Sequence, residues 1–486
     1  MGSRAGYLLD AFLRRFPYGP TPCQERLLGI LAEFITGDDG DILVVNGYAG
    51  TGKTSLLASV IDVMSEFKMP CILLSPTGRS AKVLSLYAGR PAYTIHKHIY
   101  RQESHGDDGF GQFSLSPNKA KGALFVVDEV SLIGIDSGTR QGSAEFGSGN
   151  LLDDLVRFVR SGVECKLVLV GDSAQLPPVG LDASPALSPE YMNAFGGVSY
   201  ATLTTVVRQA SGSGILENAT HLRTILPSVE DGMEAGSLGL SVNGFADIRR
   251  LGGGELLEAL SDAYSLYGEE ETVVLCRSNK RANRYNAGIR AQVQFKEEQL
   301  VRGDKLMIVK NCYQFCENLE GTDYMANGDI AVLESIRNYE DRYGLHFADA
   351  RLSLPDYGGQ EIHAKVVLDT LSSESPALTY EQSNMLYQGV SEDYSHIRGR
   401  KKRYDAVRED PFFNALQLKY AEAITCHKAQ GGQWKCVFID NPFWQDFLVA
   451  DDLKWLYTAL TRAVEKVYLV NFKDKCFQGQ QQAGGA

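Results

Sequence analysis

Three features that the sequence lacks limit what this protein can be. The chain has 486 residues, and none of its apolar runs approaches the roughly 20 consecutive residues that a membrane-spanning helix needs. Residues 1–16 are interrupted by arginines and predict a helix, not a signal peptide. The nine cysteines include one close pair, Cys312 and Cys316, without the second pair that a zinc site requires. The sequence therefore predicts a cytoplasmic protein with reduced thiols.

An excess of positive charge is also missing, because the formal net charge is −12. This balance argues against a protein that coats nucleic acid. It still permits one that draws a single strand through a local basic groove, since net charge and local field differ. The apolar fraction of 44% and the charged fraction of 22% are typical of a globular protein, and the length predicts two or three domains.

The first motif with chemical content is "NGYAGTGKTSLL", residues 46–57, which follows the apolar run Ile42–Val45. Its pattern, G-x-x-x-x-G-K-[ST], predicts a turn whose backbone N–H groups face phosphate oxygens at the start of a helix. Lys53 would reach the β- and γ-phosphates, and the Thr54 hydroxyl would bind Mg²⁺. The alternative is an ordinary glycine turn between a strand and a helix. The predicted nucleotide-binding residues of this loop are Gly47, Ala49, Gly50, Thr51, Gly52, Lys53, Thr54 and Ser55.

Two further motifs place polar side chains where apolar strands end. In "LFVVDEVSLI", Asp128 would hold Mg²⁺ and Glu129 would act as general base toward the attacking water. In "LVLVGDSAQLPPVG", the strand delivers Asp172 and Gln175, and an amide suits a residue that senses the γ-phosphate or its attacking water. Acidic residues also end strands as simple caps, but together with the glycine-rich loop the set predicts nucleotide hydrolysis.

The order of the elements predicts an α/β protein. Apolar runs such as "CILLSPT" and "KLVLVGD" alternate with helical stretches, which indicates βαβ units and parallel sheets. A second series, "TVVLCRSN", "KCVFID" and "KVYLV", predicts a second such domain. We expect domains at residues 1–207 and 208–486, with insertions at about 101–121 in the first and a β-rich module at about 333–418 in the second.

Nine motifs follow one another along the chain: "TPCQ", "GYAGTGKT", "LLSPTGRSAK", "YTIHKHI", "VVDEVSLI", "LVGDSAQLPPVG", "TTVVRQ", "AITCHKAQGGQW" and "YTALTRA". This series resembles that of the superfamily 1B helicases, the RecD-like and Dda-like 5′-to-3′ DNA motors. The resemblance covers about residues 21–470 apart from the two insertions. Its most specific parts are "GDSAQLPPVG", "TCHKAQG" and "YTALTRA".

The resemblance implies two RecA-like parallel-sheet domains, a small pin insertion in the first and an SH3-like β insertion in the second. It implies ATP and Mg²⁺ as cofactors, single-stranded and forked DNA as partners, and activity as a monomer. Gln24 corresponds to a glutamine that recognises adenine, and Arg208 and Arg462 to arginines that reach the γ-phosphate from the second domain. The residues that correspond to strand contacts are Thr77, Thr94, His96, Thr425 and His427. The chain departs from the family at Gly432-Gln433, where members often carry Ser-Glu.

In the family, the first insertion holds a hairpin pin that splits the duplex. Asp108-Gly109 would form its turn, and either Phe110 or Phe113 would stack on a displaced base, unless both only pack the hairpin onto its domain. The basic run at 398–403 is either a solvated loop or a DNA contact. Two other functions stay open: an ATPase subunit active only within a larger recombination or nuclease complex, and a P-loop ATPase that needs no nucleic-acid track.

Overall fold

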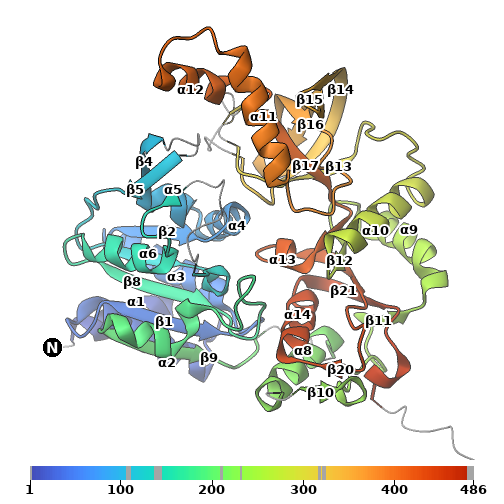
Figure 1. Ribbon diagram of the computed structural model, residues 1–486. Coiled ribbons are helices and arrows are strands. Elements are labelled where there is room, and N and C mark those ends of the chain that lie inside the picture. Colours follow the sequence, from blue (N-terminus) through green and yellow to red (C-terminus); the bar gives the residue numbers. More distant parts are fainter. Residues whose placement is uncertain are drawn as a thin grey trace, which may run out of the picture. The chain divides into compact units, whose positions relative to one another are not determined.

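The chain folds into two compact units, each built around a parallel sheet (Figure 1). The computed structural model describes residues 3–105, 111–135, 145–207, 212–229, 232–312, 314–315, 319 and 325–478. The first unit comprises residues 1–247, 445–461 and 474–486, and the second comprises 248–444 and 462–473. The expected division at residues 207 and 208 assumed domains that are continuous in sequence, whereas the compact units are not. Among the described residues, no helix combines the length and apolar character needed to cross a membrane.

The first unit contains a six-stranded sheet in which every pairing is parallel. From edge to edge its strands are β3 (Ala92–Thr94), β2 (Cys71–Ser75), β6 (Leu124–Val127), β8 (Lys166–Gly171), β1 (Ile42–Gly47) and β9 (Val198–Leu203). The four apolar runs predicted as strands of this domain are β1, β2, β6 and β8. The predicted parallel sheet is therefore confirmed.

Helices cover both faces of this sheet. Along β1, Leu43 and Val45 belong to one buried cluster, whereas Ile42 and Val44 belong to another. Successive side chains of a strand point to opposite faces, so a sheet buried on both faces needs a continuous apolar run. The helices of the unit are α1 (Arg4–Arg15), α2 (Pro22–Thr36), α3 (Lys53–Glu66), α4 (Gly78–Ala88), α5 (Ile95–Ile99), α6 (Leu151–Arg160), α7 (Pro189–Met192), α8 (Gly214–Ile225) and α14 (Ala450–Leu460). A two-stranded pairing joins β10 (Met233–Glu234) to β20 (Phe447–Leu448).

A hairpin occupies the stretch predicted as the first insertion. Its strands β4 (Tyr100–His105) and β5 (Gly111–Leu115) pair antiparallel, with Gln102 opposite Phe113, and β5 also pairs with β7 (Glu145–Phe146). Phe113 is half-buried and packs against the core cluster under the hairpin. The predicted turn at Asp108-Gly109 and the candidate Phe110 lie outside the described residues.

The second unit contains a five-stranded sheet whose pairings are also all parallel. Its strands, in order, are β11 (Ile248–Leu251), β21 (Ala463–Val470), β19 (Trp434–Asp440), β12 (Thr272–Cys276) and β18 (Ala423–Thr425). The helices α9 (Leu256–Tyr267), α10 (Asn279–Gln292) and α13 (Cys426–Ala429) accompany it. The three runs predicted as strands of the second domain are β12, β19 and β21, so the second parallel sheet is confirmed as well.

The second unit also contains a closed five-stranded barrel. Its strands are β13 (Lys305–Ile308), β14 (Ile330–Arg342), β15 (Leu345–Leu354), β16 (Gln360–Val367) and β17 (Leu416–Tyr420). The barrel uses β13, which precedes the predicted module at 333–418. Two helices, α11 (Tyr380–Asp393) and α12 (Arg400–Glu409), lie between β16 and β17, so this stretch is partly helical. The basic run at 398–403 includes two residues before α12 and the first four residues of that helix.

Candidate active site

The glycine-rich loop joins β1 to α3 in the first unit. Gly50 and Gly52 have φ angles of +75° and +78°, which side chains rarely tolerate. A Cβ at Gly47 would lie 2.7 Å from Cδ of Lys53. The first turn of α3 follows Gly52, which supplies no side-chain cap. Glycine has no side chain that could accept from the backbone N–H groups of this turn, so they are suited to an external acceptor, and an anion is the acceptor that a helix N-terminus favours.

The Lys53 side chain folds over this loop. Its ammonium donates to the carbonyl oxygens of Gly47 and Tyr48, the latter at 3.2 Å, and lies 4.0 Å from Oδ2 of Asp172. The carboxylate belongs to the residue after β8, so β1 and β8 bring these two predicted residues together. The sequence motifs that contain them lie more than a hundred residues apart, and neighbouring parallel strands explain their meeting.

The side chain of Gln24 on α2 contacts the glycine-rich loop. Its Oε1 accepts the Thr21 N–H at 2.9 Å, and its Nε2 donates to the Thr51 carbonyl at 3.0 Å. The side chain is 1% exposed, and a Cβ at Gly52 would lie 2.7 Å from Nε2. Gln24 therefore links the start of α2 to the loop, because one end of its amide caps the helix and the other end holds the Thr51 carbonyl. Its contact with adenine stays a prediction.

Asp128 and Glu129 follow β6, as expected. The Glu129 N–H donates to Oδ1 of Asp128 at 2.9 Å, and Glu129 itself has a φ of +56°. A glutamate in this left-handed region is uncommon, and such backbone is found where a side chain must be directed. Burial first, and then the charge of Glu129, raise the pKa of Asp128 to about 7. The surroundings thus disfavour the charge of this carboxylate, which a neighbouring cation would stabilise.

Gln175 lies after β8 and is 4% exposed. Its backbone N–H donates to the Asp172 carbonyl at 3.2 Å. Within the part of the chain that the structure describes, its Oε1 has no hydrogen-bond partner. A buried acceptor without a partner is costly, so this oxygen suits a ligand or a water molecule.

Sequence reasoning missed the contribution of α14 to this site. The Tyr457 hydroxyl accepts the Ala49 N–H at 2.9 Å and donates to Oδ2 of Asp172 at 2.8 Å. The Thr458 hydroxyl accepts the Leu176 N–H at 2.8 Å. Both residues belong to the quoted motif "YTALTRA", but only its arginine was selected, because the resemblance gave the tyrosine no role.

A second missed residue is Arg223 on α8. Its guanidinium lies 4.3 Å from the centre of the Tyr48 ring, within the range of a cation–π contact. Tyr48 occupies the second position of the glycine-rich loop. The sequence signal was weak, because a single arginine on a helix is most often a surface residue.

The predicted strand contacts are dispersed over both units. In the first unit, the hydroxyls of Thr77 and Thr94 cap α4 and α5, each accepting a backbone N–H at 3.2 Å. His96, on α5, lies 5.8 Å from Tyr100 between ring centres. In the second unit, Thr425 precedes α13 without forming a side-chain cap, and His427 is exposed on that helix. The two capping threonines thus have a structural task that their motifs did not reveal.

Of the two predicted arginine fingers, the structure describes only Arg462. Arg208 lies outside the described residues. Arg462 belongs to the second unit, is 4% exposed, and donates from Nη1 to the Gly432 carbonyl at 3.2 Å. This contact also involves the position where the chain departs from the family motif. The catalytic role of both arginines stays a prediction.

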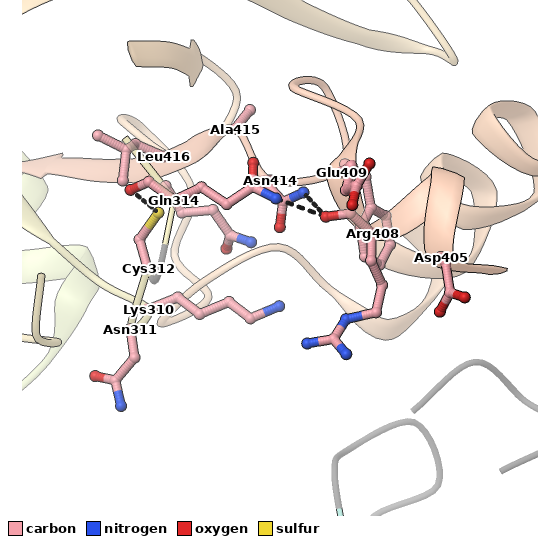
Figure 2. A pocket seen from close by; sticks show the side chains of 12 residues that line it. Lys310, Asn311, Cys312, Gln314, Asp405, Arg408, Glu409, Asn414, Ala415 and Leu416 are labelled. Atoms are coloured by element: carbon pink, nitrogen blue, oxygen red, sulfur yellow. Dashed lines mark hydrogen bonds between the residues drawn. The ribbon is translucent and has the colours of Figure 1, made fainter. Parts of the chain in front are cut away.

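The second unit also has a hollow of about 520 Å³ beside the barrel (Figure 2). Its wall is formed by the segment after β13, by α12 and by the start of β17, and it includes the charged residues Lys310, Asp405, Arg408 and Glu409. The Asn414 amide donates to the Arg408 carbonyl at 2.6 Å. None of the predicted site residues lines this hollow, so it is separate from the candidate nucleotide site.

Two family profiles match parts of this chain. Residues 30–228 match a family described as an AAA domain, and residues 420–470 match a family described as a UvrD-like helicase C-terminal domain. The first match contains the glycine-rich loop, the acidic pair and Gln175. The second contains the motifs around His427 and Arg462.

Three known proteins show how far the similarity reaches. The ATP-dependent RecD2 DNA helicase of Deinococcus radiodurans is 32% identical over 181 residues, which cover 37% of this chain and 21% of that protein. The ATP-dependent DNA helicase dda of Enterobacteria phage T4 is 23% identical over 453 residues, which cover 88% of this chain and 94% of that protein. The chain thus spans about a fifth of the first relative and nearly all of the second. The structure of a Pif1 helicase from Bacteroides matches 95% of this chain and 94% of that chain, with 16% identity and a TM-score of 0.49.

Proposed function

Because the chain belongs to the RecD-like and Dda-like helicases of superfamily 1B, we propose that it is an ATP-dependent DNA helicase. In this proposal it moves 5′-to-3′ along single-stranded DNA and unwinds duplex DNA as a cytoplasmic monomer. The observation that carries it is the uncapped first turn of α3 behind a glycine-rich loop, with Lys53 beside Asp172. A helix start without its own cap, next to a lysine, is suited to bind phosphates.

The residues after β6 fit the chemistry of Mg²⁺ and water. Asp128 and Thr54 offer oxygen ligands, which Mg²⁺ prefers, and the raised pKa of Asp128 indicates a carboxylate whose ionised form a cation would favour. When bound, Mg²⁺ neutralises charge on the β- and γ-phosphates. We propose that Glu129 orients the attacking water and takes its proton. Gln175, with its unpartnered Oε1, would accept a hydrogen bond from the same water.

Two arginines and one glutamine complete the proposed nucleotide chemistry. Arg208 and Arg462 would stabilise the charge that develops on the γ-phosphoryl group, because a guanidinium matches charge spread over equatorial oxygens. Gln24 would contact adenine with the amide hydrogen and the lone pair that its two backbone contacts leave unused.

We propose that single-stranded DNA is held by Thr77, Thr94 and His96 in the first unit, and by Thr425 and His427 in the second. Hydroxyl and imidazole groups bind phosphate and ribose without reading bases. The hydroxyls of Thr77 and Thr94 accept a helix N–H as caps, and a hydroxyl that accepts one hydrogen bond can still donate its proton to a phosphate or ribose oxygen. The β4–β5 hairpin would be the pin that separates the strands.

One paired assay tests this proposal. We expect ATP hydrolysis by the purified chain to rise on addition of single-stranded DNA, and duplexes with a 5′ tail to be unwound. Hydrolysis that does not respond to DNA would support a P-loop ATPase without a track. Unwinding that appears only with added partner proteins would support a subunit of a larger complex, and efficient unwinding from a 3′ tail alone would contradict the direction.

A further inference from the structure

A tyrosine already occupies one donor of the phosphate-binding loop. The Tyr457 hydroxyl accepts the Ala49 N–H at 2.9 Å. The tyrosine is 3% exposed, so water does not compete freely for this hydrogen bond. Ala49 lies in the glycine-rich loop, where backbone N–H groups serve phosphate oxygens in proteins of this type. The phenol therefore stands in a position where an acceptor from a ligand would bind.

The same hydroxyl reaches the carboxylate next to Lys53. It donates to Oδ2 of Asp172 at 2.8 Å, and this oxygen lies 4.0 Å from the Lys53 ammonium. The other oxygen, Oδ1, accepts the Ala174 N–H at 3.0 Å, so the carboxylate is fixed in place. A lysine in this position reaches the β- and γ-phosphates. The hydroxyl thus shares a carboxylate oxygen with the lysine that would serve the β- and γ-phosphates.

Helix α14 is also attached to the first unit by contacts that do not involve this tyrosine. The Thr458 hydroxyl accepts the Leu176 N–H at 2.8 Å, and the Lys454 ammonium donates to the Asp182 carbonyl at 2.6 Å. The helix also packs beside α8 (Figure 1). Loss of the Tyr457 contact would therefore shift the side chain and its helix turn without detaching the helix.

We propose that the Tyr457 hydroxyl is a placeholder for an oxygen of the terminal phosphate, and that a nucleoside triphosphate displaces it whereas a diphosphate does not. This inference rests on the proposed function. A charged phosphate oxygen is a stronger acceptor than a neutral phenol, so it takes over the Ala49 N–H. Tyr457 is then a positioning residue. Its displacement would couple the position of α14 to the presence of the γ-phosphate, because the triphosphate disfavours the state in which the hydroxyl binds Ala49 and the diphosphate does not.

The variant Tyr457→Phe tests the placeholder because it keeps the ring and removes the hydroxyl. It leaves the Ala49 N–H without its internal acceptor, so the affinity for a non-hydrolysable ATP analogue should rise roughly 3- to 10-fold. The affinity for ADP should stay within about twofold of the parent. Tyr264→Phe is the matched control, since the Tyr264 hydroxyl donates to Oε2 of Glu422 at 2.9 Å in the second unit. The control should change neither affinity.

A second measurement does not depend on that variant. The chain has three tryptophans, and Trp455 is fully buried on α14. In the double variant Trp434→Phe, Trp444→Phe, the emission of Trp455 reports the surroundings of this helix. We expect the ATP analogue to change this emission and ADP to leave it unaltered.

The outcomes separate the two proposals. Equal responses to the two nucleotides, in affinity and in emission, would overturn the placeholder while leaving the helicase proposal intact. So would an unchanged affinity of Tyr457→Phe for the ATP analogue. A parent chain that binds neither nucleotide would overturn the proposed function itself.

Discussion

The two parallel sheets differ at the start of the helix that follows a central strand. In the first unit, β1 is flanked by parallel strands on both sides, and α3 follows Gly52 without a side-chain cap. In the second unit, β12 is flanked in the same way, but the Ser278 hydroxyl caps α10 by accepting the Arg281 N–H at 3.3 Å. Among the described residues, the same architecture therefore has a helix start without a side-chain cap in one unit and a capped helix start in the other.

The acidic residues at the ends of strands differ in the same sense. Asp440, the last residue of β19, is held by Arg281 at 2.8 Å and by the Tyr285 hydroxyl at 2.7 Å. Asp128, after β6, instead adjoins a second carboxylate, and its pKa rises to about 7 through burial and that charge. A buried carboxylate paired with an arginine has its charge compensated within the fold, whereas a carboxylate with a strongly shifted pKa is more often found at a functional site. We therefore assign the proposed contacts with phosphate and Mg²⁺ to the first unit, and only the proposed arginine finger Arg462 to the second.

The strongest test of this assignment is Lys53→Ala. Hydrolysis of ATP should fall below detection, because the loop loses the cation that serves the phosphates. Binding of single-stranded DNA, measured by fluorescence anisotropy, should stay close to the parent value. Lys119→Ala, an exposed lysine of the same unit, is the control and should hydrolyse ATP normally. Near-normal turnover by Lys53→Ala would remove the basis for the phosphate site.

Removal of a proposed arginine finger tests whether the second unit contributes a side chain to ATP hydrolysis. We expect Arg462→Ala to lower kcat by about a thousandfold while changing the affinity for ATP little, because the guanidinium acts on charge formed in the transition state. Arg208→Ala should behave alike. Arg462 also holds the Gly432 carbonyl, so circular dichroism must first show that the variant is folded. Full kcat in a folded variant would show that the arginine is structural.

A smaller effect on ATP chemistry, but a large one on unwinding, is expected at the hairpin of the first unit. Phe113→Ala should reduce duplex unwinding severely and spare hydrolysis stimulated by single-stranded DNA. Stacking of a base on an aromatic ring contributes about 1–3 kcal/mol, comparable with the roughly 1.4 kcal/mol needed to open one base-pair step. Phe195→Ala is the control, since Phe195 packs on the same core cluster outside the hairpin. Equal unwinding rates for the parent and Phe113→Ala would show that Phe113 is not the stacking ring, and Phe110→Ala would then be the variant to test.

The smallest expected effect concerns the capped helix of the second unit. Ser278→Ala should lower the free energy of unfolding by about 1 kcal/mol, because the first turn of α10 loses its cap. Turnover of ATP should not change. Urea unfolding followed by circular dichroism measures the first quantity, with Ser265→Ala on α9 as a control inside a helix. If Ser278→Ala instead impaired ATP hydrolysis as strongly as Arg462→Ala, the start of α10 would have a catalytic role, and the contrast between the uncapped α3 and the capped α10 would be wrong.

Much of the nucleotide site could be predicted from short stretches of sequence. The turn before Lys53 is determined locally, because glycines at positions with positive φ and a lysine at the helix start belong to one continuous segment. The apolar runs of β1, β6 and β8 were equally informative, because a strand buried on both faces needs apolar residues at every position. These runs also placed Asp128 and Asp172 at the same edge of a sheet.

Only the tertiary structure determined the contacts that join distant segments. Leu306 of β13 pairs with Tyr420 of β17, and the stretch between them, expected to be rich in β-strand, also contains α11 and α12. In the same way, Tyr457 binds the amide of Ala49 from the far end of the chain. Periodicity reports how a segment exposes its own side chains, but pairing between remote segments depends on how their buried surfaces pack together. The sequence by itself therefore determined the glycine-rich loop, and the packing of α14 within the first unit decided which side chain touches that loop.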